Sequence, residues 1–144
     1  MGPETLRADT LLPITAGMRF DAASLDERGL WAEVVLHEML HCMGFGSLWE
    51  AEGLLASDGA GYVGPAGMAE YAAMGGAGPA PVETECGAGT TGLHWSEAAF
   101  GDELMTGWTA GAGPLSSLTL ASLADLGYAL APRDGCAVDA AFHA

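Results

Sequence analysis

The 144-residue chain contains no lysine and only four arginines, against 19 acidic residues, so its formal net charge is −15. Proteins that bind nucleic acid or anionic membrane surfaces do so through clusters of basic side chains. Four scattered arginines cannot form such a cluster. We therefore expect neither nucleic acid nor a membrane surface as a partner, and we interpret the acidic residues as a solvated surface that keeps the protein soluble.

Long apolar runs are also missing. No stretch of 18 consecutive apolar residues occurs, so the sequence predicts no membrane span. The first 20 residues lack a basic start followed by an apolar segment, and we expect no signal peptide there.

Cysteine is scarce and irregularly spaced, at Cys42, Cys86 and Cys136, which excludes a zinc knuckle or a disulfide scaffold. One disulfide could form, and the loop-like sequence around Cys86 and Cys136 favours that pair. Cys42 lies inside a predicted helix, where we interpret it as a small, buried side chain rather than a reactive thiol.

Half of the residues are hydrophobic, which is enough for an ordered core, and the length predicts one domain over residues 1–144. The clearest element is a helix over residues 30–43, which is apolar around most of its circumference and is predicted to be buried. Gly44 is suited to end it in the left-handed conformation. The other expected elements are a strand over 14–20, a helix over 66–74 closed by Gly75, and a helix over 117–126 with a serine cap and Gly127 at its end.

Residues 45–93 differ from the rest of the chain because glycines interrupt them throughout. Apart from the helix over 66–74, they predict little regular structure. Loops of this length are usually functional or disordered. We interpret residues 45–93 as a long insertion.

The helix carries the stretch HEMLHCMGFGS over residues 37–47. His37 and His41 lie about 40° apart around the helix and ~6 Å along it, so both imidazoles can reach one metal ion. Glu38 lies too far around the helix to bind the same ion, and the motif assigns it to proton transfer from a metal-activated water. Two histidines and a glutamate on an otherwise apolar helix would be costly without such partners.

A catalytic zinc takes three protein ligands and a water, so a third ligand is needed. The remaining histidines are His94, where the sequence returns to core-like residues, and His143, which we expect to be exposed near the chain end. Cys42 points about 100° away from His41 and is a poor candidate. Carboxylates remain open as the third ligand: Glu70, Glu97 and Glu103.

HEMLHCMGFG, followed much later by HW at residues 94–95 and ELMTG at 103–107, resembles the metzincin proteases, specifically the leishmanolysin-like peptidases and their bacterial relatives. Most metzincins place the third histidine directly after the helix-ending glycine, a place that Ser47 occupies here. In leishmanolysin-like enzymes, a long insertion separates the helix-ending glycine from the third histidine, and Gly44 and His94 are separated in the same way here. The stretches MRFDAASL, GTTGLHWSE and PLSSLTLASLADLGY extend the resemblance to about residues 14–130.

The resemblance implies an α+β, zincin-like catalytic domain that hydrolyses peptide bonds of a peptide or protein substrate. It implies that His37, His41 and His94 bind one zinc ion and that Glu38 is the general base. Met105 would form the Met-turn, an apolar floor below the metal, and Glu97 is kept only as the runner-up ligand.

The resemblance also implies secretion or a cell-surface location, and we expect a monomer. About 30 residues precede the active-site helix, enough for one or two strands, so we expect part of the N-terminal subdomain of a metzincin to be reduced or absent. Trp108 is interpreted as a core residue or a wall of the cleft. The alternative function is a non-catalytic, zinc-stabilised binding or adhesion module, or an inactive fragment of such a protease.

Overall fold

The computed structural model describes residues 2–85, 87, 89–108 and 113–131. Within them, the structure combines helices with two small sheets, which is compatible with the expected α+β class. None of the described helices is long and apolar enough to cross a membrane. Cys86, Cys136 and His143, and with them the expected disulfide, lie outside the described residues.

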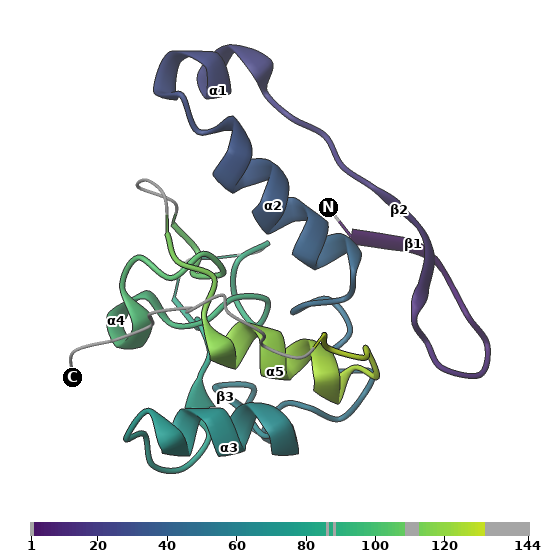
Figure 1. Cartoon of the computed structure of the whole chain (residues 1–144), viewed down its shortest axis with the longest axis vertical. Coiled ribbons are helices and arrows are strands. Elements are labelled where there is room, and N and C mark those ends of the chain that lie inside the picture. Colours follow the sequence, from purple (N-terminus) through teal and green to yellow (C-terminus); the bar gives the residue numbers. More distant parts are fainter. Residues whose placement is uncertain (1, 86, 88, 109–112, 132–144) are drawn as a thin grey trace.

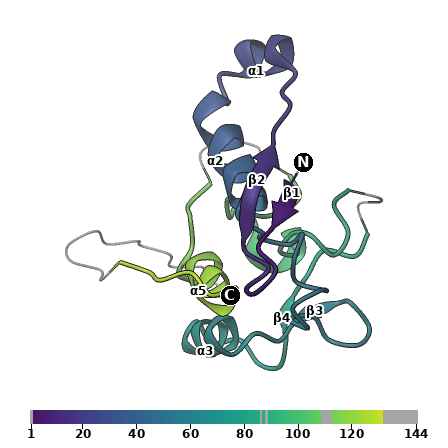
Figure 2. The same cartoon turned by 90° about the vertical axis from the view of Figure 1, so that its right-hand side faces the viewer.

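The N-terminus forms an antiparallel hairpin of β1 (Gly2–Leu6) and β2 (Pro13–Gly17), which pairs Gly2 with Gly17 and contains two register shifts. The predicted strand over 14–20 is therefore shorter than expected, and β1 was not predicted. The hairpin lies beside the second half of α2 (Figures 1 and 2). In the sequence, α1 (Ala22–Arg28) lies between β2 and α2. It begins at Asp21, whose side chain accepts hydrogen bonds from Ser24.

The motif helix, α2 (Trp31–Cys42), matches the predicted span to within a residue or two. Gly44 follows it with φ +105°, the left-handed conformation expected after a helix end. The prediction that the whole helix is buried is wrong. Trp31, Leu36 and Met39 are 37, 40 and 46% exposed. Trp31 lies in the first turn of α2, which extends away from the core towards α1 (Figure 1), whereas Leu36 and Met39 lie farther along the helix, next to the buried residues His37, Leu40 and His41.

The core lies below α2 and is built largely from the glycine-rich segment 45–93. That segment has few regular elements, as predicted: β3 (Gly61–Tyr62), α3 (Pro65–Ala73) and β4 (Ala80–Pro81). It nevertheless supplies many of the buried core side chains: Phe45, Leu48, Trp49, Leu54, Tyr62, Ala80 and Val82. The segment is thus part of the core rather than a loop on its surface.

The aromatic centre of the core explains how so little regular structure is held together. Phe45, Trp49, Tyr62 and Trp95 contact one another with ring centroids 4.6–5.4 Å apart, mostly edge to face. Such rings bury large areas and prefer tilted contacts. Because Trp95 is in this group, the 45–93 segment is packed directly against the residue that follows His94.

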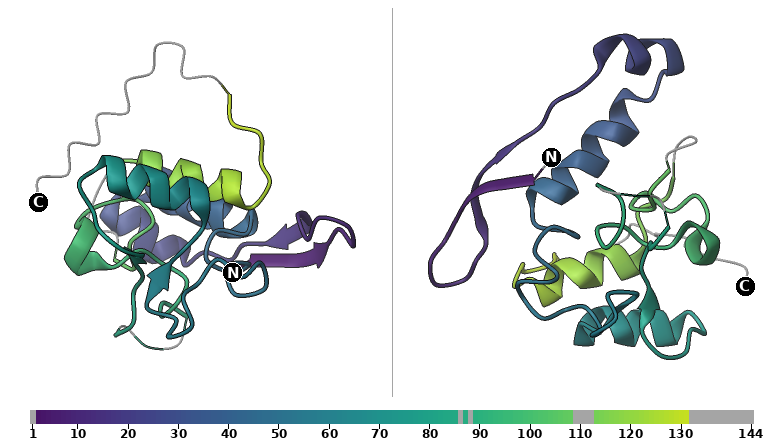
Figure 3. Two further views of the ribbon diagram at one scale, coloured as in Figure 1. Left: turned by 90° about the horizontal axis from the view of Figure 1, so that it is seen from below. Right: turned by 180° about the vertical axis from the view of Figure 1, so that it is seen from behind.

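The C-terminal part contains α4 (Glu97–Phe100) and α5 (Ser117–Asp125). α5 begins as predicted, with the Ser116 hydroxyl accepting from the Thr119 N–H at 3.1 Å, and Gly127 follows it at φ +98°. Figure 3 shows α5 alongside α3, and the Asp125 carboxylate joins them by accepting from the first N–H groups of α3, on Ala66 and Gly67.

Candidate metal centre

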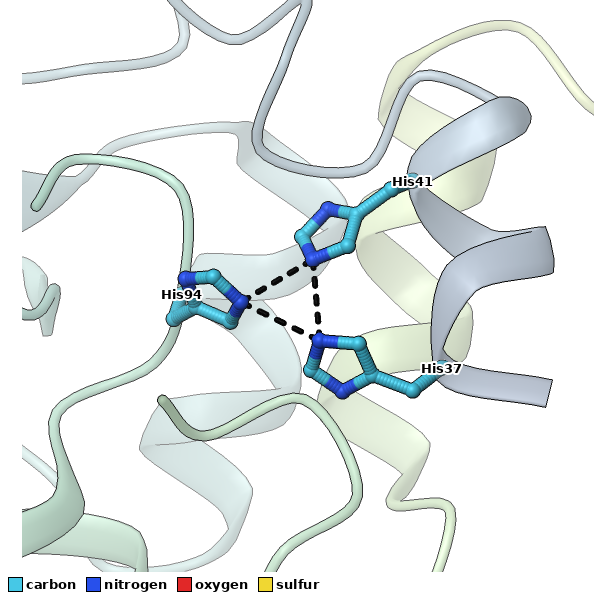
Figure 4. Close-up of side chains that lie close together, drawn as sticks. All are labelled: His37, His41 and His94. Carbon is cyan, nitrogen blue, oxygen red and sulfur yellow. Dashed lines mark hydrogen bonds between the residues drawn. The ribbon is translucent and has the colours of Figure 1, made fainter. Parts of the chain in front are cut away.

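Three histidine side chains from distant parts of the chain meet at one point. His37 and His41 lie one turn apart on α2, and His94 follows a turn shortly before α4. Their Nε2 atoms form a nearly equilateral triangle, with separations of 3.1 Å for His37–His94 and 3.0 Å for the other two pairs (Figure 4). All three side chains are buried, with 6–8% exposed.

The other ring nitrogen of each histidine faces a backbone carbonyl. Nδ1 of His37 lies 2.7 Å from the Leu104 oxygen, Nδ1 of His41 lies 3.0 Å from the Phe45 oxygen, and Nδ1 of His94 lies 3.0 Å from the Thr90 oxygen. A carbonyl oxygen can only accept, so we assign the ring proton to Nδ1 in all three. Each Nε2 then directs a lone pair at the other two.

Three converging lone pairs repel one another unless a cation lies between them, so the donor chemistry fits a metal ion. Nitrogens bound to one zinc at 2.0–2.1 Å in tetrahedral geometry are roughly 3.3 Å apart, and the observed separations of 3.0–3.1 Å are close to that. Burial lowers the pKa of His41 to about 3 and that of His94 to about 4. Both rings are therefore neutral at physiological pH, as metal ligands must be.

Short backbone contacts place His94 beside α2, although the 45–93 segment of 49 residues separates it from Gly44. The Glu83 N–H donates to the His94 carbonyl at 2.9 Å, and the Trp95 N–H donates to the Met105 carbonyl at 3.0 Å. At the other end, Gly46 (φ +69°) lies so close to Leu93 that a Cβ atom would overlap its carbonyl. Only glycine combines that backbone conformation with that approach.

Met105 is fully buried within the hydrophobic core, and the turn that contains it contacts the site through the carbonyl of Leu104. Glu38 is partly buried beside His37, and burial raises the pKa of its carboxyl group. Among the described residues, the group of side chains placed to hold a metal consists of the three histidines and does not include Glu38.

None of the alternative ligands that the sequence offered joins this group. The Glu103 carboxylate is occupied by hydrogen bonds from Ser116 and from backbone N–H groups. The thiol of Cys42 points to the Gly17 carbonyl of the hairpin, at 3.9 Å. Glu70 and Glu97 are partly buried on α3 and α4 but do not belong to the histidine group.

Sequence reasoning missed several groups that shape the site. The carbonyls that hold the three Nδ1 atoms are backbone atoms and leave no signature in the sequence. Glu103 was considered as a ligand, not as a buried hydrogen-bond acceptor. Trp108 is 66% exposed, so its interpretation as a core residue is wrong.

Comparison with known proteins adds one finding. Residues 78–132 match the peptidase M8 (leishmanolysin) family. This span is less than half of the chain; it includes His94 and Met105 but not α2. No curated protein and no solved structure matches the chain. The part of the chain that supplies His94 to the histidine cluster is therefore similar to the leishmanolysin family.

Proposed function

We propose that the protein is a zinc-dependent endopeptidase in which His37, His41 and His94 bind one catalytic zinc ion. The convergence of three unprotonated Nε2 atoms within 3.1 Å of one another carries this proposal. The match of residues 78–132 also favours a peptidase, because the matched family is the peptidase M8 (leishmanolysin) family.

The number of ligands favours a catalytic rather than a structural ion. A structural zinc site is closed by four protein ligands, whereas a catalytic site has three and leaves one position open. The described part of the chain supplies three ligands to this group. The binding or adhesion module, the alternative function, would have no use for an open position or for Glu38.

Zinc, when bound, supplies Lewis acidity, which polarises a substrate carbonyl and acidifies a water molecule. Glu38 takes the proton that the attacking water loses and delivers it to the nitrogen of the leaving amine as the peptide bond breaks. Its raised pKa suits this role, because a carboxylate that is partly desolvated is a stronger base than one in water.

The remaining assignments belong to the same proposal. Residues 1–144 form one catalytic domain of the metzincin type, in which residues 45–93 are the insertion between the second and third zinc ligands. Met105 provides the apolar floor below the ion. The substrate is a peptide or protein, the enzyme acts as a monomer, and the family resemblance favours secretion or the cell surface.

The test uses the purified chain, loaded with zinc, in a casein cleavage assay with and without a chelator. We expect cleavage that a chelator abolishes and that added zinc restores. Glu38→Gln should keep the zinc and lose cleavage, by at least ~100-fold for the loss of a general base. Glu33→Gln, which removes a carboxylate near the start of the same helix, is the matched control and should retain activity.

Three results separate the hypotheses. Zinc binding without cleavage in the wild type would favour the binding module. Full activity of Glu38→Gln would remove Glu38 from the mechanism. Cleavage that persists in a chelator would exclude a metallopeptidase altogether.

A further inference from the structure

Glu103 is almost completely buried, with 2% of its surface exposed, although it carries a carboxylate. Four neutral donors contact the two oxygens. Oε1 accepts from the N–H of Ser116 at 3.1 Å, from its hydroxyl at 2.6 Å, and from the hydroxyl of Thr119; Oε2 accepts from the N–H of Met105. Desolvating a carboxylate costs several kcal/mol, so a residue that only had to fill this space would not be ionisable.

The contact between Oε2 and Met105 leads directly to the metal site. The N–H of Met105 and the carbonyl of Leu104 belong to one planar peptide group. That carbonyl accepts the Nδ1–H of His37 at 2.7 Å. A continuous chain of hydrogen bonds therefore runs from the imidazole of His37, across the peptide, to the carboxylate of Glu103.

The other two histidines offer a comparison within the same site. The carbonyl that accepts from Nδ1 of His94 is that of Thr90, and it shares a peptide group with the N–H of Thr91. That N–H donates to the Gly87 carbonyl at 3.1 Å, so this chain of hydrogen bonds ends on a neutral acceptor. The Nδ1-to-carbonyl distances are 3.0 Å for His94 and His41 but 2.7 Å for His37. Hydrogen bonds in a chain polarise one another, and one that ends on an anion is shortened most.

A second connection links Glu103 to the segment that carries His94. The Thr119 hydroxyl, which donates to Glu103, accepts from the indole N–H of Trp95 at 2.8 Å. Trp95 directly follows His94, and its backbone N–H donates to the Met105 carbonyl at 3.0 Å. Glu103 thus holds the turn below His37 and the segment of His94 to the same end of α5.

We propose that Glu103 is a positioning residue of the metal centre, which orients His37 and raises the electron density at its Nε2 through the Leu104–Met105 peptide. Outer partners of metal-bound histidines are usually carboxylates or carbonyls in direct contact with the ring. Here the carboxylate acts through one intervening peptide. This inference rests on the metal centre proposed above.

Glu103→Gln tests the connection selectively. A glutamine can keep its oxygen towards the three donors at Oε1, and its NH₂ group then faces the N–H of Met105, so the bond to the peptide is lost while the cap of α5 stays. Asp125→Asn is the matched control. Its carboxylate accepts from the Tyr62 hydroxyl and the N–H groups of Ala66 and Gly67, on the side of α5 that faces α3.

The first measurement is zinc affinity, by competition with a chromophoric chelator, with the d–d spectrum of the cobalt-substituted protein as a second readout. Removing an outer partner of a ligand typically weakens binding ~10- to 100-fold, and we expect that loss and a shifted cobalt spectrum for Glu103→Gln. Asp125→Asn should lose comparable stability towards urea but keep wild-type affinity and spectrum. Equal affinities in the two variants would overturn the inference.

The second measurement needs no variant. In the zinc-loaded wild type, the three imidazole Nδ1–H protons can be compared by NMR. The proton of His37 should resonate farthest downfield and exchange most slowly. Similar chemical shifts for all three rings would contradict a connection from His37 through the Leu104–Met105 peptide to Glu103. A wild-type chain that binds no zinc would overturn the metal centre and this inference together, whereas a wild type that binds zinc with an unremarkable His37 would overturn the inference alone.

Discussion

Acid should destabilise the metal-free protein, and the two most perturbed histidines give the size of the effect. Burial lowers the pKa of His41 to about 3 and that of His94 to about 4, from 6.5 in the unfolded chain. A base whose pKa is lowered by folding contributes its full stability above 6.5, and that contribution is lost as the pH falls towards the folded-state pKa. Below pH 6.5, the unfolded chain binds protons at these two histidines, whereas the folded chain keeps both rings neutral until the pH approaches their lowered pKa values.

The magnitude at about pH 5 depends only on the unfolded-state value, because both folded-state values lie below that pH. A drop of about 1.5 pH units below 6.5 costs about 2 kcal/mol for each histidine, at 1.36 kcal/mol per unit. The pair therefore loses about 4 kcal/mol, a large part of the 5–15 kcal/mol that stabilises a typical domain.

The assay is urea unfolding of the chelator-treated protein at about pH 7.5 and about pH 5, followed by tryptophan fluorescence. The His41→Gln, His94→Gln double variant is the control, because it keeps the 19 acidic residues and their pH response. We expect the wild type to lose about 4 kcal/mol more than the double variant between the two pH values. Equal losses would refute the reasoning, since the two histidines would then titrate in the folded protein as they do in water.

Three further predictions follow from the same structure. Gly46→Ala should lower both stability and zinc affinity, because its methyl group would push Leu93 and the following His94 away from α2. Urea unfolding and zinc titration measure the two losses. An unchanged zinc affinity would contradict the idea that the contact between Gly46 and Leu93 places His94. Trp95→Phe should cost about 1 kcal/mol more in free energy of unfolding than Trp49→Phe. Both rings are fully buried, but within the described residues only the indole N–H of Trp95, of these two, has a hydrogen-bond partner, the Thr119 hydroxyl; equal costs in urea would argue against that bond. Zinc at 1,000 times its Kd should stabilise the wild type by about 4 kcal/mol, and a chelator should reverse this, with the same gain in Glu38→Gln and none in His94→Gln.

Helix ends were the most predictable part of the fold. α2, α3 and α5 end within two residues of the predicted positions because Gly44, Gly75 and Gly127 supply the left-handed conformations, at φ +105°, +92° and +98°, that stop a helix. This signal is local, so one sequence is enough to read it.

The core was less predictable because its contacts are not local. The buried aromatic residues of the 45–93 segment follow no helical or strand period, and only their packing against Trp95 shows that the segment is ordered. Burial of α2 was overestimated for a related reason. An apolar stripe indicates what a helix can bury, but which turns meet the core depends on where the helix lies.

The histidine cluster could be predicted from the sequence because histidine is rare in this chain. Four histidines, two of them one helical turn apart, leave few combinations for a metal site. The partners that orient the rings were not reachable. The carbonyl of Leu104 is a backbone atom, and the role of Glu103 depends on a turn and a helix end meeting in space.

The most direct test of the metal centre is a zinc titration of the chelator-treated chain, compared with His94→Gln. In the proposed site, His94 is the ligand that the packing of the 45–93 segment brings to α2. Its contribution to zinc binding therefore tests both the site and the fold that forms it. We predict one zinc ion per wild-type chain and a loss of binding in His94→Gln. A wild type that binds no zinc, or a variant that binds it equally well, would contradict the three-histidine site.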